Sequence, residues 1–324
     1  MSTILISFAS WEPRFIMGVT HLIKEGGIEK CVIVYSTEYA TRTAPNRDEL
    51  KKIAKEHNVE LSEIPIELAT SIASWKQFVH ELPQYFTSDI DVLFDISTAP
   101  REPLWYVLHI LDALGCNVQW IYHHPGSYTK DWLSRNSQSP RLILKRSGIA
   151  LPGKKTCIIA LAGFDHERLA QLIERYEPIK CFVGRQTGNQ LDNPSRNTGF
   201  NEAFINQKEI EVFDFDCYDA SNEAVQTLLK RLPIDIWEKY NVIGAALGPK
   251  PSAITMFKLT QIHPEMGLVY IPSGEYNPEY SSGIDLNKTS RGKINRLECL
   301  VSKDLYFKQP LAQSVAHDAG NLPA

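Results

Sequence analysis

Two stretches of the chain have the same spacing of aromatic residues and glycine, WIYHHPGSYTKDW at positions 120–132 and LVYIPSGEYNPEY at positions 268–280. Each begins with a short apolar run and continues into a turn with proline and glycine, which is typical of a β-strand and the loop after it. The matching positions, all 148 residues apart, are Tyr122 with Tyr270, Gly126 with Gly274, Tyr128 with Tyr276, and Trp132 with Tyr280. The shared Tyr-x3-Gly-x-Tyr string indicates an internal repeat.

The repeat continues toward the start of the chain, and the number of residues that separates matching positions changes little. The further matches are Pro100-Arg101 with Pro249-Lys250 at 149, Leu82-Pro83 with Leu232-Pro233 at 150, Cys31 with Cys181 at 150, and Ser10-Trp11-Glu12 with Gly163-Phe164-Asp165 at 153. Arg14 follows the last match in one copy and Arg168 in the other. Chance similarity between two parallel-sheet domains would explain equal strand spacing but not identical strings. We therefore predict a tandem duplication of a unit of about 150 residues.

Short β-branched runs alternate with helical patterns in both copies. The predicted strands are 3–9, 31–36, 59–66, 92–96 and 118–122, then 156–162, 179–184, 210–215, 242–247 and 268–271; the helices predicted in the first copy are 12–25, 47–57, 72–86 and 101–114. Strands that alternate with such helices predict βαβ crossovers. The predicted fold class is therefore α/β, with two tandem Rossmann-like domains and mostly parallel sheets, related by internal duplication.

The boundaries of these units follow from turn residues and polar stretches. We predict a first domain at 1–136, a linker at 137–155 that has room for an extra edge strand, a second domain at 156–308, and a disordered tail at 309–324. A polar insertion at 187–199 is a candidate mobile loop.

The composition narrows the classes of function. A chain of 324 residues with 43% hydrophobic and 22% charged residues is typical of a globular protein. No apolar run reaches the roughly 18 residues of a membrane span, and the start lacks a secretory signal, so we expect a cytoplasmic protein without membrane contact. A net charge of −4 does not indicate direct DNA binding. The six cysteines, which we expect to be reduced, are Cys31, Cys116, Cys157, Cys181, Cys217 and Cys299.

The turn after the fourth strand has the composition of an anion site. Ligands of open parallel sheets bind at the carboxyl ends of the strands, where helix amino termini point inward. Asp95 ends this strand, Pro100 suits a first helical turn, Ser97 or Thr98 is expected to cap the helix, and Arg101 adds positive charge. We expect this turn to hold an anion such as phosphate.

The corresponding turn of the second copy keeps only part of this pattern. Gly248 permits close backbone approach and Lys250 supplies the charge, whereas Gly244 and Ala246 stand where the first copy has its acid and hydroxyl. We therefore expect an asymmetric pocket in which the first copy carries specificity.

These residues resemble the CARF superfamily. The resemblance rests on Asp95-x-Ser97-x3-Arg101 after the fourth strand, together with Ser7 and Ser10 in the loop after the first strand. It covers the first 150 residues. It implies that the two loops line a pocket at a two-fold axis, and that this pocket binds a cyclic oligoadenylate or a related nucleotide made during antiviral defence.

A duplicated domain can associate with itself and form one composite pocket from two matching sets of strand ends. Arg101 and Lys250 are then expected to hold phosphates, while Tyr128 and Tyr276 offer stacking faces for bases. Tyr122 and Tyr270 are interpreted as ordinary strand aromatics. The candidate ligand-binding residues are Ser10, Glu12, Arg14, Asp95, Ser97, Thr98, Arg101, Tyr128, Gly163, Arg168, Gly248, Lys250 and Tyr276.

The loops after the first strand leave two interpretations open. Both copies combine an acid with an arginine, Glu12 with Arg14 and Asp165 with Arg168. These are either surface ion pairs at a helix start or parts of the site.

The sequence favours a binding module over an enzyme. No P-loop, G-x-S-x-G, H-E-x-x-H, kinase or zinc motif is present, and no cofactor is expected. Asp95, Glu102 and the pair His123-His124 are the candidates for acid, base or metal chemistry. We expect a nucleotide sensor that signals to an effector protein in trans. The alternatives are a ring nuclease or other phosphodiesterase in the same pocket, and a scaffold subunit of a defence or nucleic-acid-processing complex.

Overall fold

A computed structural model of the chain describes residues 3–88, 90–129, 131–163, 166–186 and 209–294. This part contains two six-stranded sheets, ordered β16-β5-β4-β1-β2-β3 and β8-β13-β12-β9-β10-β11. Five strands of each sheet are parallel, and the sixth is antiparallel. The predicted fold class of two Rossmann-like domains is confirmed, and the equal strand order agrees with the predicted duplication.

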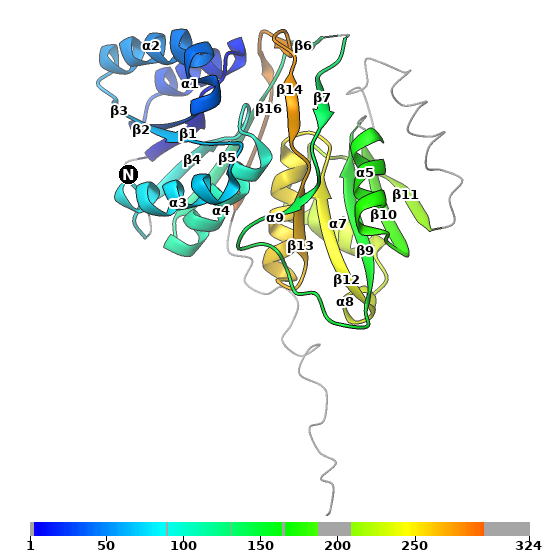
Figure 1. Cartoon of the computed structure of the whole chain (residues 1–324). Coiled ribbons are helices and arrows are strands. Elements are labelled where there is room, and N and C mark those ends of the chain that lie inside the picture. The colour runs from blue at the N-terminus through cyan, green and yellow to red at the C-terminus, as the bar shows by residue number, and fades with distance from the viewer. Residues whose placement is uncertain (1–2, 89, 130, 164–165, 187–208, 295–324) are drawn as a thin grey trace, which may run out of the picture.

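The first half forms one sheet with its helices (Figure 1). Its elements are β1 (Thr3–Phe8), α1 (Pro13–Glu25), β2 (Ile28–Ser36), the 3-10 helix η1 (Thr37–Tyr39), α2 (Ala40–Glu56), β3 (Glu60–Ile66), α3 (Ser71–Glu81), the 3-10 helix η2 (Leu82–Gln84), β4 (Asp91–Asp95), α4 (Arg101–Leu114) and β5 (Asn117–His124). Three short strands follow, β6 (Ser127–Tyr128), β7 (Ser134–Ser137) and β8 (Arg141–Leu142).

The second half repeats this order. Its elements are β9 (Lys155–Ala162), α5 (His166–Tyr176), β10 (Lys180–Gln186), β11 (Ile210–Phe215), α7 (Asn222–Arg231), α8 (Ile236–Lys239), β12 (Tyr240–Ala246), α9 (Pro251–Ile262), β13 (Gly267–Tyr270), β14 (Ser273–Tyr276), β15 (Ser281–Ser282) and β16 (Asp285–Ile294). The insertion predicted at 187–199, the tail at 309–324, and Phe164 and Asp165 lie outside the described residues.

Each sheet takes its antiparallel strand from the other half of the chain. β16 pairs with β5 of the first sheet, and β8 pairs with β13 of the second. β8 lies in the stretch 137–155, where an extra edge strand was expected. The short strands also cross between the halves, because β6 pairs with β15 and β7 pairs with β14. The sequence boundaries of the two domains remain a prediction.

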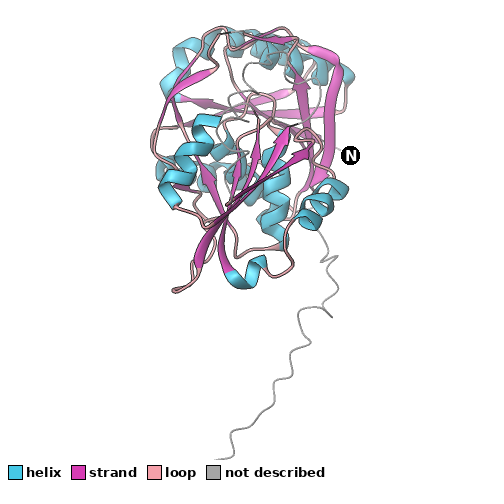
Figure 2. Ribbon diagram, turned by 90° about the vertical axis from the view of Figure 1, so that its right-hand side faces the viewer, coloured by secondary structure: helices cyan, strands magenta, loops and turns pink. Residues whose placement is uncertain are grey.

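One hydrophobic core continues through both halves. Helices α4 and α9 pack against each other between the sheets, and Figure 2 shows helices beside and between the strands. Trp105 and Phe257 are fully buried in this core, and the Trp105 indole nitrogen donates to the carbonyl of Ala253 at 2.9 Å. This packing fixes the carboxyl ends of the two sets of parallel strands relative to each other.

Two further expectations concern the cysteines and membrane-spanning helices. Cys31, Cys116, Cys157, Cys181 and Cys217 are free thiols, and Cys299 lies outside the described residues. None of the helices in the described part of the chain combines the length and apolar character that a bilayer span requires.

Candidate functional site

Two adjoining cavities lie where the strand ends of the two halves meet. The space open to a water-sized molecule measures about 110 Å³ in the first cavity and about 70 Å³ in the second. Both are lined by residues from both halves, and they share Arg14, Arg101, Ser134, Arg168, Lys250 and Tyr280. The halves therefore build one composite site.

The cavities are strongly cationic. Arg14 on α1, Arg101 at the start of α4, Arg168 on α5 and Lys250 before α9 line both of them. Glu12 is the one carboxylate among the described residues that line these two cavities. Arg14 pairs with Glu12 at 3.0 Å as one interpretation expected, but the side chains of Arg14 and Arg168 are buried, so the surface location in that interpretation is wrong. A buried excess of positive charge favours an anionic ligand.

Arg101 and Lys250 make reciprocal contacts across the boundary between the halves. The Arg101 guanidinium donates to the carbonyl of Gly248, and the Lys250 side-chain nitrogen donates to the carbonyl of Ala99. Both acceptors are neutral carbonyls in the turns before α9 and α4. Phosphate oxygens accept stronger, charge-assisted hydrogen bonds, so both cations are suited to anion binding.

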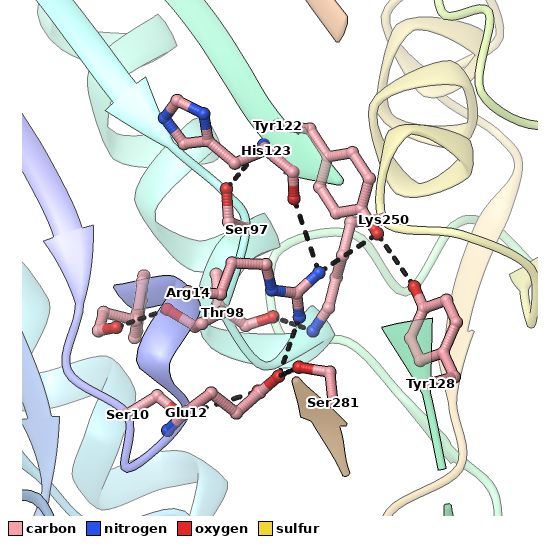
Figure 3. Close-up of polar contacts among 12 residues, drawn as sticks. Ser10, Glu12, Arg14, Ser97, Thr98, Tyr122, His123, Tyr128, Lys250 and Ser281 are labelled. Carbon is pink, nitrogen blue, oxygen red and sulfur yellow. Dashed lines mark hydrogen bonds and ion pairs between the residues drawn. The ribbon is translucent and has the colours of Figure 1, made fainter. Parts of the chain in front are cut away.

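Arg14 is the centre of a second network, drawn in Figure 3. One terminal nitrogen donates to the Glu12 carboxylate at 3.0 Å, and the other contacts the Tyr122 hydroxyl at 3.3 Å and the His123 carbonyl at 3.5 Å. Ser281, from β15 of the second half, donates to the same Glu12 oxygen as Arg14. Glu12 thus links the loop after β1 to the second half through its hydrogen bond with Ser281.

Two tyrosine pairs occupy equivalent places in the halves. The hydroxyls of Tyr122 and Tyr128 are 3.1 Å apart, and those of Tyr270 and Tyr276 are 3.4 Å apart. Burial raises the pKa of Tyr128 and of Tyr270, so these phenols stay protonated. Tyr122 and Tyr270 lie on strands as expected, and both also line the cavities.

Burial lowers the pKa of Lys250 well below its usual range, and the charges of Arg101 and Arg14 lower it further. An anion placed next to this amine would counteract the shift, because an opposite charge favours the ammonium form. Lys250 therefore couples the protonation of the site to its occupancy by an anion.

Asp95 and Ser97 lie beneath the cavity wall and line neither cavity. Asp95 accepts from the Ser7 hydroxyl at 3.0 Å and the Ser97 hydroxyl at 2.5 Å, and the Ser97 oxygen accepts from the His123 amide at 2.8 Å. These contacts join the ends of β1, β4 and β5. A ligand contact for Asp95 and Ser97 remains a prediction.

The expected side-chain cap of α4 is wrong. Thr98 donates to the carbonyl of Phe8 at 2.6 Å, and Pro100 precedes the helix without a side-chain cap. The Ser97 oxygen instead accepts from the His123 amide, and the Thr98 hydroxyl is directed to the end of β1. Thr98 itself still lines the first cavity.

The structure brings together most of the residues proposed from the sequence. The members of that set that line one or both cavities are Ser10, Glu12, Arg14, Thr98, Arg101, Tyr128, Gly163, Arg168, Gly248, Lys250 and Tyr276.

Sequence reasoning missed several other lining residues, among them Trp11, Tyr39 and Tyr280. Tyr280 had a signal, since it matches Trp132 in the repeat. Trp11 lies between the two candidates Ser10 and Glu12, and this position was its signal in the sequence. Tyr39 follows the end of β2, a position that the repeat does not mark.

The remaining candidates for acid, base or metal chemistry lie outside the two cavities. Glu102 is buried and accepts from Ser71 at 2.9 Å and from Arg141 of β8. His123 is buried on β5, and burial lowers the pKa of His124 to about 4. Within the described residues, no group of three or more His, Cys, Asp or Glu side chains is arranged to hold a metal.

No protein-family model matches the chain, and no curated protein matches it. A solved structure described as a type III CRISPR defence DNA nuclease activated by cyclic oligoadenylate is similar in fold, with a TM-score of 0.51 and 9% identity. The alignment covers 79% of this chain and 63% of the nuclease. Can2 from Sulfobacillus thermosulfidooxidans in complex with cyclic tetra-adenylate aligns over 36% of this chain and 31% of its own, with 7% identity and a TM-score of 0.28. The chain thus spans less than two thirds of either protein.

Proposed function

We propose that this protein senses a phosphate-bearing nucleotide, bound in the composite site between its two Rossmann-like domains, and signals to an effector protein in trans. The observation that carries the proposal is the convergence of Arg14, Arg101, Arg168 and Lys250, two from each half, on adjoining cavities that also contain tyrosines. Guanidinium and ammonium groups hold phosphates, and aromatic rings stack on bases.

The arrangement favours a ligand with several phosphates and approximate two-fold symmetry. Arg101 and Lys250 occupy equivalent places and reach across the same boundary in opposite directions. The fold similarity to a nuclease activated by cyclic oligoadenylate supports such a ring as the first compound to test. A role in prokaryotic antiviral defence is part of this proposal.

The test is a ligand panel with two readouts. Purified protein is incubated with cyclic tetra-adenylate, cyclic di-AMP, linear tetra-adenylate and inorganic tripolyphosphate, and both the melting temperature and the products by chromatography are recorded. A rise in melting temperature without products supports the sensor, since a ligand that binds only the folded state stabilises it. Products would show a phosphodiesterase instead. Neither a shift nor products with any nucleotide would contradict both and favour a scaffold.

A further inference from the structure

Glu12 is an unusual wall residue for an anion site. Its carboxylate is buried, with 8% of the residue exposed, and lines the first cavity together with Arg14, Arg101, Arg168 and Lys250. A buried carboxylate requires compensation, which Arg14 and Ser281 provide at one oxygen, Oε2 (Figure 3). The other oxygen, Oε1, has one contact from the described residues, the Ser10 hydroxyl at 3.5 Å.

This carboxylate limits which part of a ligand can lie beside it. An ionised carboxylate only accepts hydrogen bonds and can accept about four, so Oε1 keeps acceptor capacity. A phosphate placed there would meet like-charge repulsion, whereas a hydroxyl or amino group would donate to it. In a nucleotide, such donors are the ribose hydroxyls and the exocyclic amino group of the base.

Trp11, next to Glu12, has the Arg42 guanidinium 3.7 Å from the centre of its ring and offers its indole N–H as a donor suited to a base. Its ring lies 5.2 Å from that of Tyr39, and both line the first cavity with the apolar side chains of Phe8, Ile66 and Leu68. The indole nitrogen of Trp11 is buried and has no acceptor among the described residues. A ring nitrogen of a base is an acceptor of the kind this donor lacks.

We propose that Trp11 and Glu12 are specificity-determining residues that bind the nucleoside part of the ligand, Trp11 through the base and Glu12 through a hydroxyl or amino donor. The site then selects nucleotides and rejects anions made of phosphate alone. This inference rests on the proposed function and names the chemistry by which the site recognises its ligand.

The experiment compares four probes by isothermal titration calorimetry: cyclic tetra-adenylate, its 2′-deoxy analogue, cyclic tetra-inosinate and inorganic tripolyphosphate. The wild-type protein is expected to bind cyclic tetra-adenylate roughly tenfold or more tighter than tripolyphosphate. In Glu12→Gln, tripolyphosphate binds more tightly and this preference shrinks several-fold. If the donor to Glu12 is a ribose hydroxyl, the wild type binds the deoxy analogue more weakly than cyclic tetra-adenylate; if it is the amino group of the base, the wild type binds the inosinate more weakly. Either difference should shrink in Glu12→Gln, because a neutral amide oxygen is a weaker acceptor than a carboxylate.

Two further variants separate recognition from support of the fold. Ser281→Ala removes a hydrogen bond to Glu12 but keeps the carboxylate, and it should retain the preference for the nucleotide. Trp11→Ala should weaken cyclic tetra-adenylate roughly tenfold and leave tripolyphosphate unchanged, because only the nucleotide has a base whose ring nitrogen can accept from the indole. The melting temperature of each variant checks its fold.

Equal weakening of all four probes by Glu12→Gln would overturn the inference, because Glu12 would then act only by holding Arg14. Wild-type protein that binds tripolyphosphate as tightly as the nucleotide would also overturn it, while leaving an anion site in place. Wild-type protein that binds none of the probes would contradict the proposed function itself.

Discussion

Arg101 and Lys250 make the same contact in opposite directions, each donating to the backbone carbonyl that lies two residues before the other. The acceptors, Gly248 and Ala99, are equivalent in the repeat, since both lie 149 residues apart as the two cations do. The pair therefore joins the turns before α4 and α9. If the proposed anion binds between them, we expect it to compete with these neutral acceptors, because charge-assisted hydrogen bonds are stronger.

Arg101→Ala and Lys250→Ala should each weaken binding of a phosphate-bearing ligand by about 1.5 to 3 kcal/mol, the scale of a charge-assisted hydrogen bond. Titration calorimetry with the ligand found in the panel measures the change. Lys51→Ala is the matched control, because Lys51 lies on α2 and lines neither cavity. Unchanged affinity in both site variants would show that the site is assigned to the wrong residues.

Ligand binding should take up protons because the pKa of Lys250 is lowered in the free protein. A phosphate beside the amine raises this pKa toward the usual lysine value of about 10.4, so a proton binds wherever the pH lies between the free and bound values. Affinity therefore falls as the pH rises through that window. Calorimetry in buffers of different ionisation enthalpy measures the uptake.

Lys250→Arg provides the control for this proton uptake. A guanidinium stays protonated throughout the accessible pH range, so the variant keeps the charge without titrating. Its binding should show no proton uptake from position 250. Uptake equal to that of the wild type would assign the proton to another group.

The two tyrosine pairs allow stacking to be separated from hydrogen bonding. Tyr128→Phe removes the hydroxyl contact with Tyr122 and should cost about 0.5 to 1.5 kcal/mol of folding stability with little loss of nucleotide affinity. Tyr128→Ala also removes the ring and should weaken the nucleotide by about 1 to 3 kcal/mol. Affinity and chemical denaturation of both variants are compared, and equal affinities of the Phe and Ala forms would exclude stacking on Tyr128.

The parallel strands could be predicted from the sequence to within a few residues. The central ones, such as β1 and β9, are buried on both faces and form continuous apolar runs, whereas β3 and β11 are only partly buried. The start of α2 could not be predicted in the same way. The predicted helix begins at 47, whereas the structure begins it at Ala40 and continues it through Pro45, although a proline disfavours helix at the residue before it. Tertiary packing overrides the local preference here.

The pairing of β8 and β16 with the sheet of the other half could not be predicted from the sequence, for a different reason. β16 reads DLNKTSRGKI, which is largely polar and lacks the alternation of a half-buried strand, and β8 has two residues. The composition of such a polar edge strand does not identify it as a strand, and only the strand with which it pairs does so. The site could be located in advance because the carboxyl ends of parallel strands converge, but side-chain partners such as Ser281 for Glu12 depend on that exchange.

Gly292→Ala tests whether β16, which belongs to the second half in sequence, stabilises the first sheet. A Cβ at this position would lie 2.8 Å from the indole nitrogen of Trp120, a buried residue of β5, so the indole or the strand must shift. We expect a loss of about 1 to 3 kcal/mol in the free energy of unfolding, as for other overpacked sites. Arg291→Ala on the same strand is the control and should change stability by less than about 0.5 kcal/mol, because that side chain is largely exposed. Denaturant unfolding measures both variants, and equal stabilities would mean that β16 does not pack on Trp120 as the structure places it.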